Sequence, residues 1–146
     1  MELLHSRIRP DDFRAFSRCL DGKVRSRHHA EYAGWHYGAA WNGRGFERYP
    51  EYIVRAASIS DVARTIDFAR SHSLAVGVKG SGHSYSGSFF QCGGILLDLS
   101  LLNDLEIHAE QGTAIMGPGV TSAQLSRSLA AHELAFPARQ GGGGGL

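Results

Sequence analysis

Three short apolar segments, with a helix-like segment between the first two, are the feature of this sequence that most constrains its fold. Tyr52–Ala57, Leu74–Val78 and Gly94–Leu99 each have the length and composition of a strand. In the helix-like segment, Val62 and Ala69 are separated by seven residues and so share one helical face, with Ile66 between them on the same face. Apolar strands joined through a helix predict a parallel βαβ unit whose sheet is buried on both faces.

The start of that helix can be assigned to one of two serines. Ser58 or Ser60 can accept a hydrogen bond from the first turn as the N-cap residue, and Asp61 follows where the helix dipole favours a negative charge. A second helix is predicted over Asp11–Leu20, from the spacing of its apolar residues. The basic stretch Arg18–His29 has few aromatic neighbours, so we interpret it as a solvated surface and not as a nucleic-acid patch.

A different pattern follows residue 100. Leu105–His108 and Ala114–Met116 flank the turn residues Gln111-Gly112, which predicts an antiparallel hairpin. Thr121 and Gln124 have the spacing of a capping box before a further helix. The sequence therefore predicts an α+β fold, in which a small parallel βαβ-type subdomain precedes an antiparallel subdomain. We expect a helical lead-in over residues 1–45 and the domain itself over residues 46–146.

Composition excludes several classes of protein. The chain is 42% hydrophobic, which is too apolar for a disordered protein. Its 15 Lys and Arg against 14 Asp and Glu argue against a nucleic-acid or anionic-membrane partner. No signal segment or membrane-length apolar run is visible. Cys19 and Cys92 do not have the spacing of a metal site, so we expect reduced thiols in a cytoplasmic protein.

Glycine is over-represented, at 19 of 146 residues. The glycine-rich loop Lys79–Gly87 directly follows one of the predicted strands, and such loops can turn backbone N–H groups toward a phosphate. Two known phosphate loops do not match: Tyr85 stands where the dinucleotide fingerprint needs its third glycine, and Ser88 stands where the Walker loop needs lysine. On this ground a phosphate loop and an ordinary Gly/Ser turn are equally supported.

The histidines add no catalytic or metal motif. His83 lies inside the glycine loop, with no neighbouring carboxylate or second histidine that would indicate a triad or a metal site. The serines of the loop lack the GxSxG pattern of a nucleophile. His28, His29 and His36 have no partner at helical spacing, so we interpret them as surface residues.

A series of short stretches between Tyr49 and Pro137 resembles a known family. In order along the chain they are Pro50–Val54, Ser60–Val62, Phe68–Arg70, Leu74–Val76, Lys79–Gly87, Ile95–Ser100, Gly117–Val120 and Leu134–Pro137. Together they resemble the N-terminal part of the FAD-binding PCMH-type domain of the vanillyl-alcohol oxidase and p-cresol methylhydroxylase superfamily. The similarity is greatest to the berberine-bridge-like and hydroxynicotine-oxidase-like branch, which Trp41-Asn42 also fits.

The resemblance implies a role for the loop. In the family its backbone amides bind the pyrophosphate of FAD, which here implies the N–H groups of Gly80, Ser81, Gly82, His83 and Ser84. In this branch the loop histidine is often joined covalently to the 8α-methyl carbon of the flavin, and the matching residue is His83. Lys79 and Ser81 replace an arginine and a frequent glycine of the family, and lysine lacks the bidentate fork of arginine.

The resemblance ends after Pro137. Relatives usually continue with a glycine-histidine or glycine-cysteine pair and a long glycine-rich segment, whereas here Ala138–Gln140 precede the run Gly141–Gly145. That run is either part of the glycine segment or an unrelated flexible tail. The cysteine tether of some relatives has no counterpart here, because Cys92 lies elsewhere. We therefore expect a PCMH-type domain that is truncated at its C-terminal end and lacks the substrate domain.

Three functions are compatible with this reading. The first is the FAD-binding portion of an FAD-dependent oxidoreductase, in whose complete relatives a hydride passes from a substrate C–H bond to the flavin and O2 reoxidises it. The second is a non-catalytic FAD- or nucleotide-binding module. The third is a non-functional fragment of a broken reading frame. The expected partners are the small-molecule cofactor and a second chain that would complete the domain and cover its exposed strand edges.

Overall fold

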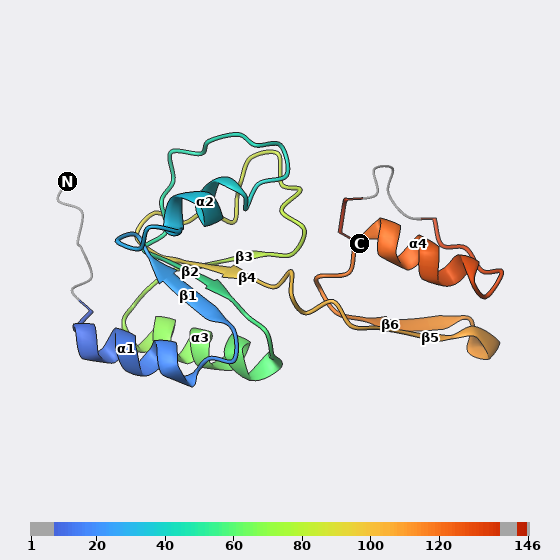
Figure 1. The fold of residues 1–146 in the computed structure, drawn as a ribbon, viewed down its shortest axis with the longest axis horizontal. Helices are drawn as coiled ribbons and strands as arrows, with labels where there is room; N and C mark the ends of the chain where they lie inside the picture. Colours follow the sequence, from blue (N-terminus) through green and yellow to red (C-terminus); the bar gives the residue numbers. More distant parts are fainter. Residues whose placement is uncertain (1–7, 138–142, 146) are drawn as a thin grey trace.

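A computed structural model describes residues 8–137 and 143–145 of the chain, which form two parts (Figure 1). The first part contains α1 (Pro10–Cys19), β1 (Lys23–Ser26), α2 (Tyr32–Tyr37), β2 (Tyr52–Arg55), α3 (Ile59–Ser71), β3 (Val76–Lys79) and β4 (Ile95–Asp98). The second part contains β5 (Leu105–His108), a 3-10 turn (Ala109–Gln111), β6 (Thr113–Met116) and α4 (Ser122–Ala130). In these residues no helix is both long enough and apolar enough to cross a membrane.

The four strands of the first part form one mixed sheet in the order β1-β2-β4-β3. β4 runs parallel to both of its neighbours, and Ile95 is in register with Tyr52 on one side and with Val76 on the other. β1 is antiparallel to β2. The predicted βαβ unit is therefore present, with β4 inserted between its two strands, and the predicted α+β fold is confirmed.

Both faces of this sheet are buried, as the apolar strands predict. Val54 and Leu97 point to the face covered by α1 and α3, where they join Phe16 and Phe68 in one hydrophobic cluster (Figure 1). On the opposite face, alternate strand residues pack against α2 and the loops around it; this cluster is Ile53, Leu96, Tyr32, Ala39, Ala40, Phe89 and Phe90. Because the period of a strand is two residues, neighbouring residues of one strand reach opposite clusters.

Helix α3 begins at Ser58, whose hydroxyl accepts a hydrogen bond from the backbone N–H of Asp61 at 3.2 Å. The predicted apolar stripe is wrong in one position, because Ile66 is exposed while Thr65 and Phe68 are buried. The reason is Asp61, whose fully buried carboxylate turns this face of the helix toward the chain that precedes β1. Thr65 follows one turn later and is buried below it, with its hydroxyl bonded to the Asp61 carbonyl.

Two elements of the first 45 residues were not predicted, β1 and α2. β1 lies within the basic stretch that we interpreted as a solvated surface, and for its buried residues Val24 and Ser26 that interpretation is wrong. The surface assignment of His36 is wrong as well. Its ring is buried between Tyr49 and Phe90, and its Nε2 lies 2.9 Å from the carbonyl oxygen of Arg48.

The second part has the predicted hairpin, in which Leu105 is paired with Met116. Helix α4 also begins where predicted, because the Thr121 hydroxyl accepts a hydrogen bond from the backbone N–H of Gln124 at 3.3 Å. The capping box is only half formed, since the Gln124 side chain donates to the carbonyl of Asn103 and not to residue 121. Leu125, on the buried face of α4, belongs to the cluster that the hairpin supports.

Candidate functional site

The glycine loop lies at the carboxyl end of the parallel strands, which is where open α/β sheets bind ligands. Residues 80–84 follow β3 directly and border a hollow of about 430 Å³. The rest of its wall includes Ser88, Phe89 and the C-terminal glycines Gly144 and Gly145. The five predicted loop residues therefore share one concave surface.

The first backbone N–H groups of this loop, those of residues 80–84, are available as donors within the described chain. In the part of the chain that the structure describes, none of the N–H groups of residues 80–84 donates a hydrogen bond. Two carbonyls of the same segment are in use: that of Gly82 accepts from Trp41 N at 3.2 Å, and that of Ser84 accepts from Gly87 N at 3.3 Å. A row of unpaired amides beside a hollow is the geometry that binds an anion.

Close packing fixes the shape of the loop. Gly82 has a φ of +77°, and a Cβ atom there would lie 2.2 Å from the carbonyl oxygen of Ala39. At Gly80 a Cβ atom would lie 2.8 Å from the carbonyl oxygen of Pro118. These two positions therefore require glycine, because a side chain would collide with the backbone of other segments.

Lys79 does not offer its charge to the hollow. Its ammonium group lies 2.9 Å from Oδ1 of Asp98, at the end of β4, and the two side chains are only 8% and 5% exposed. The same Asp98 oxygen accepts from the backbone N–H of Ser100 at 3.0 Å, and Oδ2 lies 3.7 Å from Nε of Arg55. The Lys79 ammonium group is thus neutralised within the sheet and does not supply a free positive charge to the hollow.

His83 lies half-buried in the loop, and its ring stacks on the indole of Trp41. The two ring centroids are 5.1 Å apart and the ring planes differ by 7°. The Nδ1 atom of His83 is buried and has no hydrogen-bond partner within residues 8–137 and 143–145. A buried polar atom without a partner costs about 1–3 kcal/mol, which makes it a candidate contact for a ligand.

The end of the glycine run lies against this loop. Ser122, the first residue of α4, donates to the carbonyl of Gly144 from its backbone N–H at 2.8 Å and from its hydroxyl at 3.0 Å. The backbone N–H of Gly145 donates to Oγ of Ser81 at 2.8 Å. Gly143–Gly145 therefore form part of the site and do not behave as an unrelated tail, while residues 138–142 lie outside the described chain.

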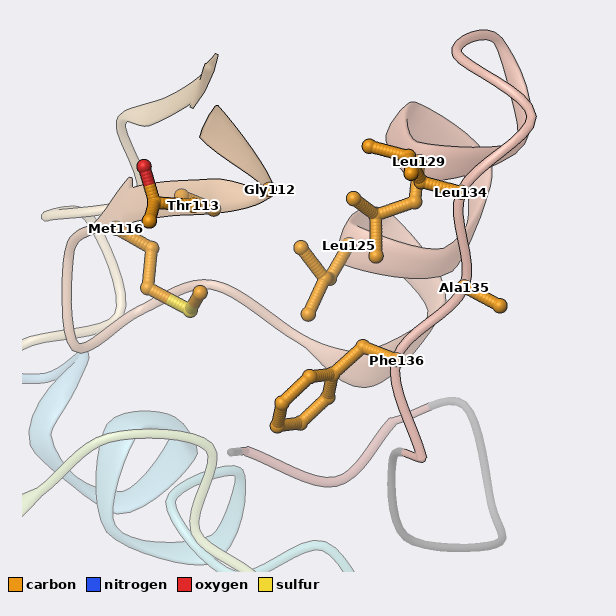
Figure 2. A pocket seen from close by; sticks show the side chains of 9 residues that line it. Gly112, Thr113, Met116, Leu125, Leu129, Leu134, Ala135 and Phe136 are labelled. Atoms are coloured by element: carbon orange, nitrogen blue, oxygen red, sulfur yellow. The ribbon is translucent and has the colours of Figure 1, made fainter. Parts of the chain in front are cut away.

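A second, apolar hollow of about 210 Å³ lies between β6 and α4 (Figure 2). The side chains of Met116, Leu125, Leu129 and Phe136 point into it from opposite sides. Its lining contains no acid, base or charged group, so it offers no chemistry of its own. No sequence pattern predicted this hollow.

Comparison with known families identifies the domain. A family model described as an FAD binding domain matches residues 50–145, which is 96 of the 146 residues. The chain belongs to this FAD-binding family. The matched range contains the glycine loop, His83 and the glycines Gly143–Gly145.

The similar proteins include an oxidase and a dehydrogenase, and each is much longer than this chain. The chain is 37% identical over 95 residues to (R)-6-hydroxynicotine oxidase of Paenarthrobacter nicotinovorans, a match covering 65% of this chain and 20% of the relative. It is 32% identical over 90 residues to D-lactate dehydrogenase of Archaeoglobus fulgidus, covering 61% of this chain and 20% of the relative.

Solved structures show the same fold. The structure of 6-hydroxy-D-nicotine oxidase from Arthrobacter nicotinovorans superposes with a TM-score of 0.69 at 31% identity, covering 77% of this chain and 24% of that one. BBE-like 1 of Physcomitrella patens superposes with a TM-score of 0.78 at 18% identity, covering 90% and 29%. The predicted N-terminal portion of a PCMH-type domain is confirmed, and the chain spans between 20% and 29% of the length of these four relatives.

Proposed function

We propose that this chain binds FAD through the backbone of residues 80–84, as the FAD-binding portion of an FAD-dependent oxidoreductase. The observation that carries the proposal is the row of five N–H groups without acceptors among the described residues. The diphosphate of FAD supplies several anionic oxygens, which match such a row. An ordinary Gly/Ser turn would leave such donors to water, so the FAD-binding test below separates the two alternatives that the sequence left open.

We further propose His83 as the covalent attachment point of the flavin. Its buried, unpaired Nδ1 and its place within the amide row support this role. The bond would join an imidazole nitrogen to the 8α-methyl carbon, which loses one hydrogen as a proton. The imidazole nitrogen would lose its own proton, and the electron pair of the C–H bond together with the two protons would reduce one molecular oxygen to hydrogen peroxide. The bound flavin would supply hydride acceptance, which no amino-acid side chain offers.

The contribution of this chain is binding and orientation. In the described residues no carboxylate or second histidine is hydrogen-bonded to His83, so the loop contains no acid–base pair for substrate chemistry. Substrate selection and the complete catalytic cycle, with O2 as the final acceptor, are therefore proposed for the longer proteins of this family. This keeps the non-catalytic binding module as the second candidate function.

The test is reconstitution of the purified full chain with FAD in air. We expect yellow protein with flavin absorbance, and a flavin signal that survives acid precipitation. His83→Ala should abolish the acid-stable signal and keep reversible FAD binding, and His108→Ala, in the distant hairpin, should behave as wild type. FMN, which lacks the diphosphate, should bind more weakly than FAD.

Each result has a separate meaning. Acid-stable flavin in the His83→Ala variant would show that the tether is wrong. Equal affinity for FMN and FAD would show that the amide row does not bind the diphosphate. A wild-type chain that takes up no FAD would overturn the proposed function as a whole.

A further inference from the structure

We infer that Trp41 is a positioning residue, which holds the imidazole of His83 in one orientation for attachment of the flavin. This inference rests on the proposed function. The juxtaposition that carries it is the parallel stack of the two rings, at a centroid distance of 5.1 Å and an angle of 7°. Trp41 lies outside the range that the family model matches, so neither the match nor the loop motif assigns it a role.

The stack matters because no hydrogen bond within the described chain orients this imidazole. Histidines that must present one nitrogen are usually fixed by a hydrogen bond from the other nitrogen to a carboxylate or a carbonyl. His83 has no such bond within residues 8–137 and 143–145, since its Nδ1 is buried without a partner. Its orientation therefore depends on packing, and the indole of Trp41 covers one face of the ring.

The backbone around Trp41 is itself anchored to the loop. Trp41 N donates to the carbonyl of Gly82, the residue before His83, at 3.2 Å. Two residues earlier, the carbonyl of Ala39 packs so closely on Gly82 that no side chain fits between them. At the edge of the His83 ring, a Cβ atom on Gly143 would be 3.4 Å from Cε1. The imidazole is thus held between the segment 39–41 and the C-terminal glycines.

The exposure of Trp41 fits this role better than a role in the core. Its side chain is 47% exposed, and its other aromatic contact is edge-on to Tyr85, at a centroid distance of 5.5 Å and an angle of 84°. A half-exposed indole contributes little to the hydrophobic clusters, and Trp41 is not a member of the two clusters on the sheet. Its removal should therefore change the site more than the stability of the fold.

The first experiment uses the flavin-free full chain and NMR of its histidine rings. Ring current from the stacked indole should displace the Cε1–H signal of His83 upfield, and that displacement should disappear in Trp41→Ala and return in part in Trp41→Phe. Tyr37→Ala is the matched control, because it removes a large exposed ring of the same N-terminal segment that has no contact with His83. It should leave the signal unchanged.

The second experiment measures the rate at which added FAD becomes acid-stable in the same variants. A displacement of a reacting group by about 1 Å can cost about 100-fold in rate, so Trp41→Ala should slow attachment by about 10- to 100-fold. Trp41→Phe should restore most of the rate. In chains that also carry His83→Ala, Trp41→Ala should change the affinity of reversible FAD binding far less than it changes the attachment rate, because the amides are supplied by the backbone.

The outcomes separate this inference from the proposed function. If wild type attaches flavin and Trp41→Ala attaches it equally fast, Trp41 has no positioning role and the proposed function stands. If the His83 signal of wild type shows no ring-current displacement, the stack is absent and the inference is overturned. If wild type takes up no flavin, the proposed function fails and the positioning role fails with it. Loss of both signal and rate, with rescue by phenylalanine, supports the inference.

Discussion

The buried ion pair between Lys79 and Asp98 makes a strong prediction about stability. It joins the carboxyl ends of β3 and β4, where the glycine loop begins, and its two side chains are 8% and 5% exposed. Asp98→Asn removes the charge but keeps an oxygen for the backbone N–H of Ser100, which the native carboxylate accepts at 3.0 Å. The change therefore isolates the cost of leaving the Lys79 ammonium group buried without an anion.

Breaking a buried pair from one side costs about 3–5 kcal/mol, because an uncompensated charge remains. For Asp98→Asn we expect a loss of stability over this whole range, about 3–5 kcal/mol. For Lys79→Met we expect the lower end, about 3 kcal/mol, because the remaining carboxylate keeps Ser100 N and has Nε of Arg55 at 3.7 Å. The double variant leaves neither charge buried, so it should be more stable than Asp98→Asn alone, which corresponds to a coupling free energy larger than the Lys79→Met loss of about 3 kcal/mol.

The assay is urea unfolding of the four chains, followed by tryptophan fluorescence. Because the pair is shielded from solvent, the coupling should be nearly the same at about 0.1 M and about 1 M salt. If the two single effects simply add in the double variant, the pair makes no specific contribution and the reasoning is refuted. Strong dependence on salt would show that the pair is exposed in solution.

Two further predictions concern backbone geometry and pH. Gly82→Ala should destabilise the chain by more than about 2 kcal/mol and weaken FAD binding, because it combines a left-handed φ of +77° with a collision at Ala39. The control Gly93→Ala, at a φ of +69° in open space, should cost only about 1 kcal/mol and leave FAD binding intact. Burial alone would raise the pKa of Asp61, but hydrogen bonds from backbone N–H groups, including that of Ala57, outweigh it and lower the pKa. The contribution of Asp61 to stability should therefore be complete above the unfolded pKa of about 3.9 and be lost as the pH falls through the lower folded pKa. Asp61→Asn should accordingly cost about 3 kcal/mol at pH 7, and progressively less in acid unfolding below about pH 4.

The sequence pattern predicted the local elements well, because their signals lie within a few residues. The strands β2 and β4, the hairpin and the helix caps at Ser58 and Thr121 all follow from short-range spacing and turn chemistry. β1 was missed for a physical reason. Its only buried apolar side chain is Val24, and it becomes a strand by pairing with β2, about thirty residues later in the chain.

Individual side chains were likewise misassigned where their contacts come from distant parts of the sequence. The apolar period of α3 was misplaced by one residue, because the Asp61 carboxylate accepts N–H groups from Asp21 and Gly22, forty residues earlier. His36 looked like a surface residue because no local pattern indicates the Arg48 carbonyl that it meets. Such nonlocal hydrogen bonds override propensity and cannot be read from spacing.

The candidate site was predicted in part, and the contact that was not predicted joins residues distant in the sequence. The loop residues 80–84 and His83 came from the motif and the resemblance, and the structure places them around one hollow. The stack of Trp41 on His83 joins positions more than forty residues apart. The family resemblance included Trp41 only within the pair Trp41-Asn42 and assigned it no contact. A signal for it would have required knowing that the backbone of Ala39 lies on Gly82.

Under the proposed function, in which backbone groups are the donors to the diphosphate, the lysine at position 79 and the serine at position 81 have other roles. Lysine in place of arginine at position 79 removes a bidentate fork, but the side chain here binds Asp98 across the sheet, for which a single ammonium donor suffices. Serine in place of glycine at position 81 adds a hydroxyl, which accepts the N–H of Gly145 and so attaches the C-terminal glycines to the loop. Neither of these contacts uses the N–H groups of residues 80–84, which the proposed function assigns to the diphosphate. A site whose ligands are amides can therefore change side chains at 79 and 81, while Gly82, which no side chain can replace without collision, stays fixed.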